Sequence, residues 1–480
     1  MSIEPLRRVP ALLACLLAAC ASVGPDYRAP RPDVPAAWQS VPVEGTRQAD
    51  PQALARWWTQ LADPQLSALM DEALQANPDL KSARAALRAA RASRDLASAK
   101  RFPTFNASAG VSRSTALGAA RTLYEAGFDA AWEPDVFGGT RRALEAAEAD
   151  LDAGLADLHA TQVSLTAEVA LNYVELRAFQ ARLAIARDNL ASQSETLQIT
   201  DWRAQAGLVG SLDVEQARSN RETTRAAIPT LDTGRAEAEH RLALLTGHTP
   251  GSLHERLVVA EGARSGLLPQ LPDTTGLLIP ADVLRQRPDV RAAERRLAAE
   301  TARVGQAEAA LYPSFSLSGS IGLQALGLST FSGGGQVARS LAAAVSGPLF
   351  DAGRLRAQVE VQDAVREQQL AAYEKTVLTA LEDVQNALVA LANSRQRREA
   401  LASAAEAARN AALLARHQYA SGLIDFQTVL TTERSLLSIE DSLASAEAER
   451  VTALIQLYKA LGGGWSADRS EAVPQSGKDA

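Results

Sequence analysis

The chain repeats itself once, and this repeat constrains its fold more than any other feature of the sequence. Five short motifs recur in the same order at a spacing of about 210 to 216 residues. The pairs are Asn77–Leu80 with Arg287–Val290, Phe102–Phe105 with Tyr312–Phe315, Phe137–Arg141 with Phe350–Arg354, Ala206–Val209 with Ser421–Ile424, and Leu245–Gly247 with Leu461–Gly463. Ordered matches of this kind indicate two copies of one structural unit. We assign the first copy to residues 46–282 and the second to residues 283–464.

Each copy combines a helix of moderate length with a much longer one. The moderate helices are predicted at residues 78–101 and 288–310, each with a proline at the first helical position. From residue 140 to about residue 205 there is no proline, and leucines recur every seven residues, which indicates coiled-coil packing. A helix of ~65 residues spans roughly 100 Å. The chain then turns and returns, so long helical hairpins are expected at about 140–246 and 352–461.

Between these helices, apolar and polar residues alternate. Residues 314–323 place Phe315, Leu317 and Ile321 on one face and serine or glycine on the other, which is the period of a β-strand. Strands of ~9–11 residues cross a membrane, and such faces suit a barrel wall between lipid and water. A soluble hairpin on a hydrophobic core is the alternative. The predicted strands are 104–112, 123–132, 314–323 and 337–347, in hairpins at about 103–136 and 313–350 with Phe331–Gly335 as an outer loop.

Four strands in one chain cannot close a membrane barrel, since the smallest known barrels have ~8 strands. No segment after the N-terminus resembles a membrane-spanning helix of ~20 apolar residues. Because open strand edges are not tolerated in lipid, strands that cross a membrane require several chains in a closed ring. Strand counting by itself allows a dimer, a trimer or a larger ring.

The N-terminus has the parts of an export signal, with Arg7 and Arg8 before a short apolar run that ends at Cys20. The last four residues, LAAC, resemble the lipobox of bacterial lipoproteins. This resemblance implies that residues 1–19 are removed as a signal peptide and that Cys20 carries S-diacylglycerol and N-acyl groups. A plain signal with an incidental cysteine is the alternative. We interpret the lipidated, proline-rich residues 20–45 as a tether and residues 465–480 as a disordered tail.

Composition argues against several functions. The net charge of -7 argues against nucleic acid as a partner. The five histidines show no metal-binding spacing, and two methionines are too few for a relay of soft metal ions. The Gly-x-Ser-x-Gly motif of serine hydrolases is absent from the sequence. We therefore expect no enzyme, no metal site and no cofactor besides the covalent lipid on Cys20.

Several motifs together resemble the TolC-like outer-membrane efflux proteins, in their lipoprotein branch of NodT and OprM type. The motifs are Gly24–Tyr27, Trp57–Trp58, Asn77–Leu80, Leu284–Glu294 and Ala309–Phe315, and the likeness runs from Cys20 to about Gly463. The resemblance implies a mainly α-helical homotrimer with a transmembrane β-barrel of twelve strands, four from each chain. A long periplasmic α-helical barrel would continue it, with residues 40–75, residues 248–282 and the C-terminal tail in or near an equatorial belt.

The same resemblance implies an exit duct in the outer membrane, with most of the chain in the periplasm. Such ducts passively conduct small molecules, such as drugs, out of a tripartite efflux pump. In the pump, a periplasmic adaptor (a membrane fusion protein) joins the duct to an inner-membrane transporter, which we expect to be of the RND type. Two alternatives stay open: a duct for protein secretion or heavy-metal export, and a lipid-anchored periplasmic coiled-coil scaffold.

The two predicted helix turns are where we expect function to concentrate. Glycine at each turn suits the left-handed end of a helix, so plain helix capping is one interpretation of both. By resemblance, the turns form the periplasmic mouth, which the family closes with rings of acidic and apolar side chains and with hydrogen bonds between helices. The candidate gate residues are Asp425, Tyr419, Arg416 and Asp213, and the candidate adaptor contacts are Gly207, Leu208, Gly422 and Leu423.

Overall fold

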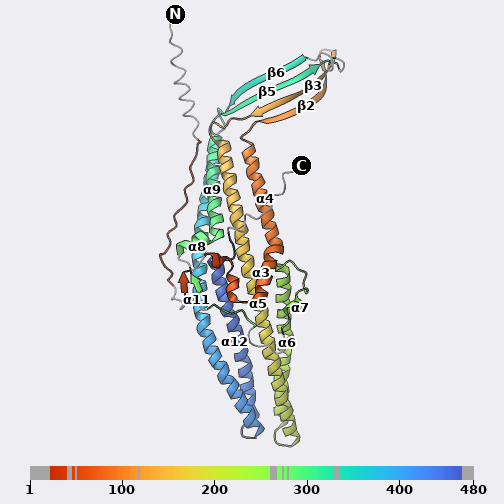
Figure 1. Ribbon diagram of the computed structural model, residues 1–480, viewed down its shortest axis with the longest axis vertical. Helices are drawn as coiled ribbons and strands as arrows, with labels where there is room; N and C mark the ends of the chain where they lie inside the picture. Colours follow the sequence, from red (N-terminus) through yellow and green to blue (C-terminus); the bar gives the residue numbers. More distant parts are fainter. Residues whose placement is uncertain are drawn as a thin grey trace. The chain divides into compact units, whose positions relative to one another are not determined.

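A computed structural model describes residues 22–39, 46–48, 51–116, 119–259, 267–272, 275–277, 280–327, 330 and 336–466 (Figure 1). The strands are β1 (Thr46–Gln48), β2 (Thr104–Ala116), β3 (Ala119–Trp132), β4 (Thr275–Leu277), β5 (Ser314–Ala325) and β6 (Gln336–Ser346). The helices are α2 (Pro51–Ala55), η2 (Trp57–Leu61), α3 (Pro64–Ala76), α4 (Pro78–Ala99), α5 (Gly139–Gln205), α6 (Ser211–Leu245), α7 (His254–Leu257), α8 (Pro280–Gln286), α9 (Pro288–Ala309), α11 (Arg354–Ala420) and α12 (Phe426–Ala460).

Contacts within the chain divide it into two units, and each unit contains parts of both repeats. Unit 1 consists of the described residues within 1–32, 85–156 and 291–376. Unit 2 consists of those within 33–84, 157–290 and 377–480.

Unit 1 contains a four-stranded antiparallel sheet in the order β2-β3-β5-β6 (Figure 1). One hairpin comes from each repeat, and the pairing of β3 with β5 joins the two hairpins. The predicted strands are confirmed. β2, β3 and β5 have 13, 14 and 12 residues and are longer than predicted, whereas β6 has 11 residues, which is the predicted length. The sequence does not predict the additional residues, because the strand ends contain small side chains and the alternation of apolar and polar residues is weak there. The predicted loop Phe331–Gly335 lies outside the described residues.

The N-terminal segment of unit 1 is bound to helix α5 rather than free. The buried guanidinium of Arg142 donates hydrogen bonds of 3.1 Å to the carbonyl oxygens of Val23 and Gly24, and it pairs with Asp26 at 2.9 Å. The prediction of a tether over residues 20–45 is therefore wrong for this part. Proline content favours an extended backbone, but it does not show what that backbone contacts.

Two further contacts hold the same segment. The Gly24 backbone has a φ of 93°, and a Cβ there would lie 2.2 Å from the Cα of Gly305, so only glycine fits. The Tyr27 hydroxyl donates a hydrogen bond of 3.0 Å to Glu294, and its ring packs against buried alanines of α5 and α9. Cys20 and the predicted signal peptide lie outside the described residues.

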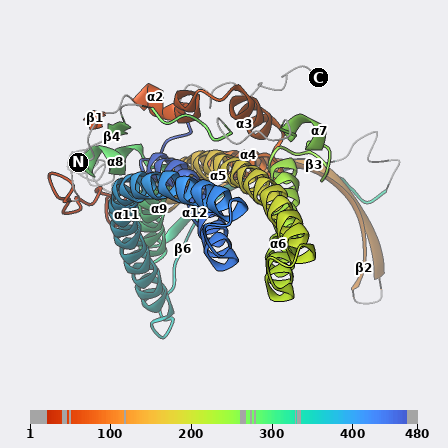
Figure 2. The same ribbon diagram turned by 90° about the horizontal axis from the view of Figure 1, so that it is seen from below.

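Unit 2 has a core of aromatic side chains beside its long helices. Trp57 and Trp58 are buried, and the Trp57 ring stacks on Tyr458 of α12 with centroids 5.3 Å apart. The Tyr458 hydroxyl donates a 3.1 Å hydrogen bond to the side chain of Gln60. Figure 2 shows the short elements α2, α3, α7 and the parallel pair β1–β4 together along one side of the long helices. These elements come from the segments that the sequence predicts for the belt.

The end of the described chain corrects one boundary. Trp465, predicted to begin a disordered tail, is buried in unit 2, where its ring stacks on His159 with centroids 4.3 Å apart. A lone tryptophan in a polar sequence gives no sign of the partner that buries it. Residues 467–480 lie outside the described residues.

The predicted long helical hairpins are confirmed. Helices α5 and α11 have 67 residues each, and the returning helices α6 and α12 have 35 each. Most leucines of the predicted seven-residue repeat in the unit 2 part of α5 are buried, namely Leu158, Leu165, Leu176 and Leu183, whereas Leu190 and Leu197 are half-buried. Among the described residues, none of the helices combines the length and the apolar character needed to cross a membrane.

Candidate functional site: two helix turns and a helix junction

The two turns of unit 2 share one backbone design. Gly207 and Gly422 have φ values of 71° and 75°, as the sequence predicts for left-handed helix ends. At the first turn, the Leu208 N–H donates to the Arg203 carbonyl at 2.9 Å, and at the second the Leu423 N–H donates to the Gln418 carbonyl at 2.9 Å. This six-to-one bond defines a Schellman motif, in which the residue after the glycine continues away from the helix. Each glycine is therefore required by a helix cap.

Both turns also present an exposed leucine. Leu208 is 68 % exposed and Leu423 is 74 % exposed, although leucine is normally buried. Each follows the left-handed glycine, so the cap itself directs the leucine outward. The structure thus presents Leu208 and Leu423, two of the four candidate adaptor contacts, as a matched pair of apolar side chains on the surface of unit 2.

The side chains behind the two turns differ. At the second turn, the ring of Tyr419 is buried and meets the ring of Phe426 edge-on, with centroids 5.8 Å apart. Both rings belong to an apolar cluster that includes Val429 and Leu430 of α12 and Ala217 of α6. Tyr419, predicted as a gate residue, is therefore a core residue of the second turn.

Tyr419 and Arg416 also fasten α11 to α5 within the same chain. The Arg203 guanidinium lies 4.5 Å from the centroid of the Tyr419 ring and donates a hydrogen bond to the Tyr419 carbonyl. The Tyr419 hydroxyl donates to Thr200 at 3.3 Å, and Arg416 donates to the Ser192 hydroxyl. Their hydrogen-bonding groups thus already have partners inside one chain.

Asp425 is the N-cap of helix α12. Its carboxylate accepts hydrogen bonds from the Thr428 N–H at 2.9 Å and from the Thr428 hydroxyl at 2.6 Å, and it is exposed. These bonds lower the pKa of Asp425, so the carboxylate is ionised at neutral pH. The capping interpretation therefore accounts for this aspartate, while its role as a gate acid stays a prediction. Asp213 lies in the first turn of α6 and is half-buried.

Sequence reasoning missed two buried carboxylates on α12. Glu433 is 4 % exposed and accepts a hydrogen bond of 2.7 Å from the Thr196 hydroxyl of α5. Glu440 is equally buried, and it accepts from Arg409 at 2.7 Å and from Asn189 at 3.3 Å. Phe426, Glu433 and Glu440 recur every seven residues, so the heptad period could have placed both acids in the helix seam.

Burial affects the charge of Glu433. Removal from water raises the pKa of its carboxyl above the ordinary value, against the opposing effects of the Thr196 hydrogen bond and of the nearby Arg416 charge. A buried acid of this kind couples the packing of the second turn to pH.

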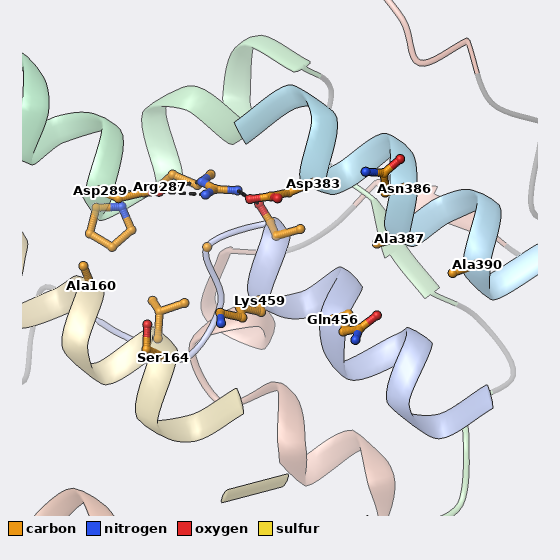
Figure 3. A pocket seen from close by; sticks show the side chains of 14 residues that line it. Ala160, Ser164, Arg287, Asp289, Asp383, Asn386, Ala387, Ala390, Gln456 and Lys459 are labelled. Carbon is orange, nitrogen blue, oxygen red and sulfur yellow. Dashed lines mark hydrogen bonds and ion pairs between the residues drawn. The ribbon is translucent and has the colours of Figure 1, made fainter. Parts of the chain in front are cut away.

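A helix junction in unit 2 encloses a cavity near the repeat boundary. It has a volume of about 420 Å³ and lies between α5, α9, α11 and α12 (Figure 3). Arg287 crosses it, paired with Asp289 at 2.7 Å and with Asp383 at 3.0 Å, and it donates a 3.1 Å hydrogen bond to the Ala460 carbonyl. The positive charge of Arg287 is therefore already neutralised within the chain, so the cavity serves the helix junction.

The first repeat has a smaller polar residue at the equivalent helix junction. Asn77 occupies the position of Arg287, and its amide donates a 3.0 Å hydrogen bond to the Leu245 carbonyl at the end of α6. Its side-chain oxygen accepts from the Leu80 N–H at 3.0 Å, which caps α4. In both repeats, one polar residue thus links the end of the returning helix to the start of the next one. Within the described ranges, no group of histidine, cysteine and carboxylate side chains could hold a metal ion.

Comparison with known proteins agrees with this architecture. The family model "Outer membrane efflux protein" matches residues 69–248 and 279–463, and each matched segment includes one copy of the predicted repeat motifs. Nodulation protein T of Rhizobium leguminosarum bv. trifolii is 33 % identical, over 94 % of this chain and 96 % of the relative. Outer membrane protein OprJ of Pseudomonas aeruginosa is 31 % identical, over 99 % of each chain.

Solved structures show the same fold. The outer-membrane channel OprN superposes with a TM-score of 0.82 at 39 % identity, covering 93 % of this chain and all of OprN. The open state of the Neisseria gonorrhoeae MtrE outer membrane channel superposes with a TM-score of 0.80 at 29 % identity, covering 93 % and 99 % of the two chains. The predicted fold class and the predicted location in the outer membrane are confirmed.

These matches extend over nearly the whole chain, and they agree with the repeated hairpins and the four-stranded sheet. The protein is an outer-membrane channel of an efflux system. The chain belongs to the outer membrane efflux protein family.

Proposed function

We propose that three copies of this chain form the passive exit duct of a tripartite pump. The observation that carries this proposal is the sheet of unit 1, which has one mostly apolar face and two edge strands, β2 and β6, that have no partner strand within the described residues. Neither feature is favourable for an isolated chain in water. When copies of the sheet join edge to edge in a membrane, the apolar face contacts lipid and the edge strands are paired.

The apolar face is formed by alternate residues of all four strands. Phe105 is 77 % exposed and Leu341 is 81 % exposed, and Phe128 and Ile321 lie on the same side. The opposite face carries Asp129 together with serines and glycines. A wall between lipid and a water-filled lumen requires this division. It also argues against a soluble coiled-coil scaffold, in which the apolar face would meet water.

The strand order permits closure by repetition. β2 and β6 are the edges of the sheet, and every neighbouring pair is antiparallel, so β6 runs opposite to β2. β6 of one copy can therefore pair with β2 of the next as an ordinary antiparallel ladder. Three copies give a closed ring of twelve strands, wide enough to leave an aqueous channel.

The turns of unit 2 are the proposed docking point for a periplasmic adaptor. The exposed side chains of Leu208 and Leu423 offer two apolar contacts per chain. The adaptor would connect the duct to an inner-membrane transporter of the RND type. Relatives named as solvent and toluene efflux pump outer membrane proteins, both from Pseudomonas putida, support small molecules as the cargo. The duct performs no covalent chemistry and only offers a path.

The covalent lipid is part of the same proposal. Cys20 lies two residues before Ser22, where the described chain begins, and Val23 and Gly24 are held by Arg142. Acyl chains on Cys20 would therefore be held close to unit 1, as a supplementary anchor beside the strands.

One preparation tests the duct, its oligomeric state and its lipid. The full chain is purified from the outer membrane in detergent, and the mass of the intact complex is measured by native mass spectrometry. The same preparation is then inserted into planar bilayers. We expect a trimer whose subunits each carry the added mass of diacylglycerol and acyl groups, and discrete ion conductance. A monomer in the soluble periplasmic fraction, or a trimer without conductance, would contradict the duct.

A further inference from the structure

The apolar face of the sheet carries two cations. Arg113 of β2 lies opposite Thr122, and Arg339 of β6 lies opposite Ile321, so both arginines share the face of Val111 and Leu341. Both side chains are exposed, and neither has an ion-pair partner among the described residues. The described residues of this face include no aspartate or glutamate. The face therefore has an uncompensated positive charge on an otherwise apolar surface.

The two arginines lie toward the end of the sheet that is far from the helices. β2 begins shortly after α4 and β6 ends shortly before α11, so Thr104 and Ser346 mark the near end. With a rise of ~3.4 Å per residue and a tilt of ~40°, Arg113 stands about 23 Å and Arg339 about 18 Å from that end. The apolar band of a membrane barrel is ~25 Å tall, and a long arginine side chain extends toward its boundary. Both guanidinium groups thus reach the outer edge of the band.

The near end of the same face is different. There Phe105, Trp132 and Phe315 supply aromatic rings, and the described residues of this end of the face include no cation. Aromatic rings suit any lipid headgroup, because they need no counter-charge. A positive charge at one boundary alone implies that the outer leaflet presents negative charge to the barrel.

We propose that Arg113 and Arg339 bind the phosphate groups of an outer-leaflet lipid of the lipid A type, which carries two phosphates. An arginine fork matches phosphate oxygens in a bidentate way, and the surrounding apolar surface strengthens the pair. The two arginines stand on the two edge strands, β2 and β6. In a closed ring they would flank the same boundary between copies, so one lipid could contact both chains. This inference rests on the lipid-facing role proposed above for the apolar face.

The test compares lipid binding by the purified full-length trimer in zwitterionic nanodiscs. The probes are lipid A with both phosphates and its fully dephosphorylated form, with bound lipid quantified by native mass spectrometry. We expect the wild type to prefer the phosphorylated form at least tenfold. The double variant Arg113→Gln/Arg339→Gln should reduce this preference to less than twofold. Each single variant provides a milder change if the double variant assembles poorly.

A matched control comes from the opposite face. Arg121 lies at the same far end of the sheet, opposite Ser114 on the polar face. Arg121→Gln should keep the wild-type preference. Equal loss in this control, or an unchanged preference in the double variant, would overturn the inference. Displacement of lipid A by millimolar inorganic phosphate would overturn the assignment to a lipid headgroup.

Conductance measured on the same trimers separates this inference from the duct itself. Trimers that conduct ions but show no lipid preference would refute the lipid site and leave the duct intact. Failure to form conducting trimers in the wild type would refute the duct.

Discussion

The two turns of unit 2 have the same backbone conformation, but different side chains pack behind them. Gly207 and Gly422 adopt the same left-handed conformation and close the same Schellman motif. One turn back, however, the first repeat has Ala204 where the second has Tyr419. At the next N-cap, Gly210 makes no side-chain hydrogen bond, whereas Asp425 binds Thr428. The two repeats therefore share the glycine cap at the end of the long helix, while the side chains around it and the N-cap of the returning helix differ.

This difference shows where each turn gets its stability. The second turn is held by a buried aromatic cluster, by bonds from Arg203 and Arg416, and by a side-chain cap. The first turn relies on the glycine cap and has an exposed Trp202 beside it. The second hairpin is thus fastened to α5, and a change that loosens it should alter the conformation of the turn. Substitutions at three positions of the second hairpin test this difference, from the largest expected effect to the smallest.

Tyr419→Ala should have the largest effect, because it gives the second turn the residue type of the first. Truncating a buried aromatic residue costs about 3–5 kcal/mol, and here it also removes the hydroxyl bond to Thr200. We expect a clear drop in the melting temperature of the trimer and a higher single-channel conductance. Trp202→Ala is the matched control, since this ring is exposed and its loss should change stability little. Equal effects of the two variants would contradict the asymmetry between the turns.

Glu433→Gln should have a smaller, pH-dependent effect. Burial raises the pKa of the Glu433 carboxyl, so the folded turn binds this proton more tightly than the unfolded chain does. The resulting stabilisation is complete below pH ~4.3, the ordinary value for glutamate, and it is lost as the pH rises through the raised value. The amide keeps an acceptor for Thr196 without the charge. We therefore expect the variant to be more stable than the wild type at pH 7, by roughly 1 kcal/mol.

The measurement for Glu433 is the melting temperature of the trimer between pH 4 and pH 8. In the variant, the melting temperature should depend less on pH, because the contribution of the Glu433 carboxyl is removed. Glu215→Gln on the exposed face of α6 is the control and should leave the profile unchanged. A variant that is less stable than the wild type at pH 7 would show that the ionised carboxylate holds the turn closed through Arg416.

Asp425 should show the smallest change in stability, and two substitutions separate its two roles. Asp425→Ala removes the cap and should cost about 0.5–2 kcal/mol, whereas asparagine caps almost as well as aspartate. Asp425→Asn should therefore keep stability and remove only the charge. If the carboxylate also closes the channel mouth, the conductance rises in both variants. A rise in the alanine variant alone would show that Asp425 acts as a helix cap only.

Local patterns in the sequence were sufficient for most of the fold. Glycine at 207 and 422 predicted the turns, because a left-handed helix end favours glycine over other residues. Alternating residues such as Phe315, Leu317 and Ile321 predicted strands. These features depend on neighbours in the chain, so the sequence displays them directly. The closed ring of three chains was predicted from the resemblance to the efflux family, because a single chain does not show how many copies assemble.

Features that depend on distant partners could not be predicted from the sequence. The sequence gives Tyr419 and Arg416 as gate candidates, but it does not show that Ser192, Thr200 and Arg203 of α5 are their partners. The burial of Glu433 required knowing that α5 packs against that face of α12.

The sequence by itself determined the repeated helix–hairpin–helix order, the two glycine turns and the apolar face of the strands, since each follows from local conformation and periodicity. Only the tertiary structure decided which polar groups are buried and which are shared. It placed Arg142 on the N-terminal segment, Arg287 between two carboxylates, and Arg113 and Arg339 on one face of the sheet. The physical reason is that burial and pairing depend on residues brought together from distant parts of the chain.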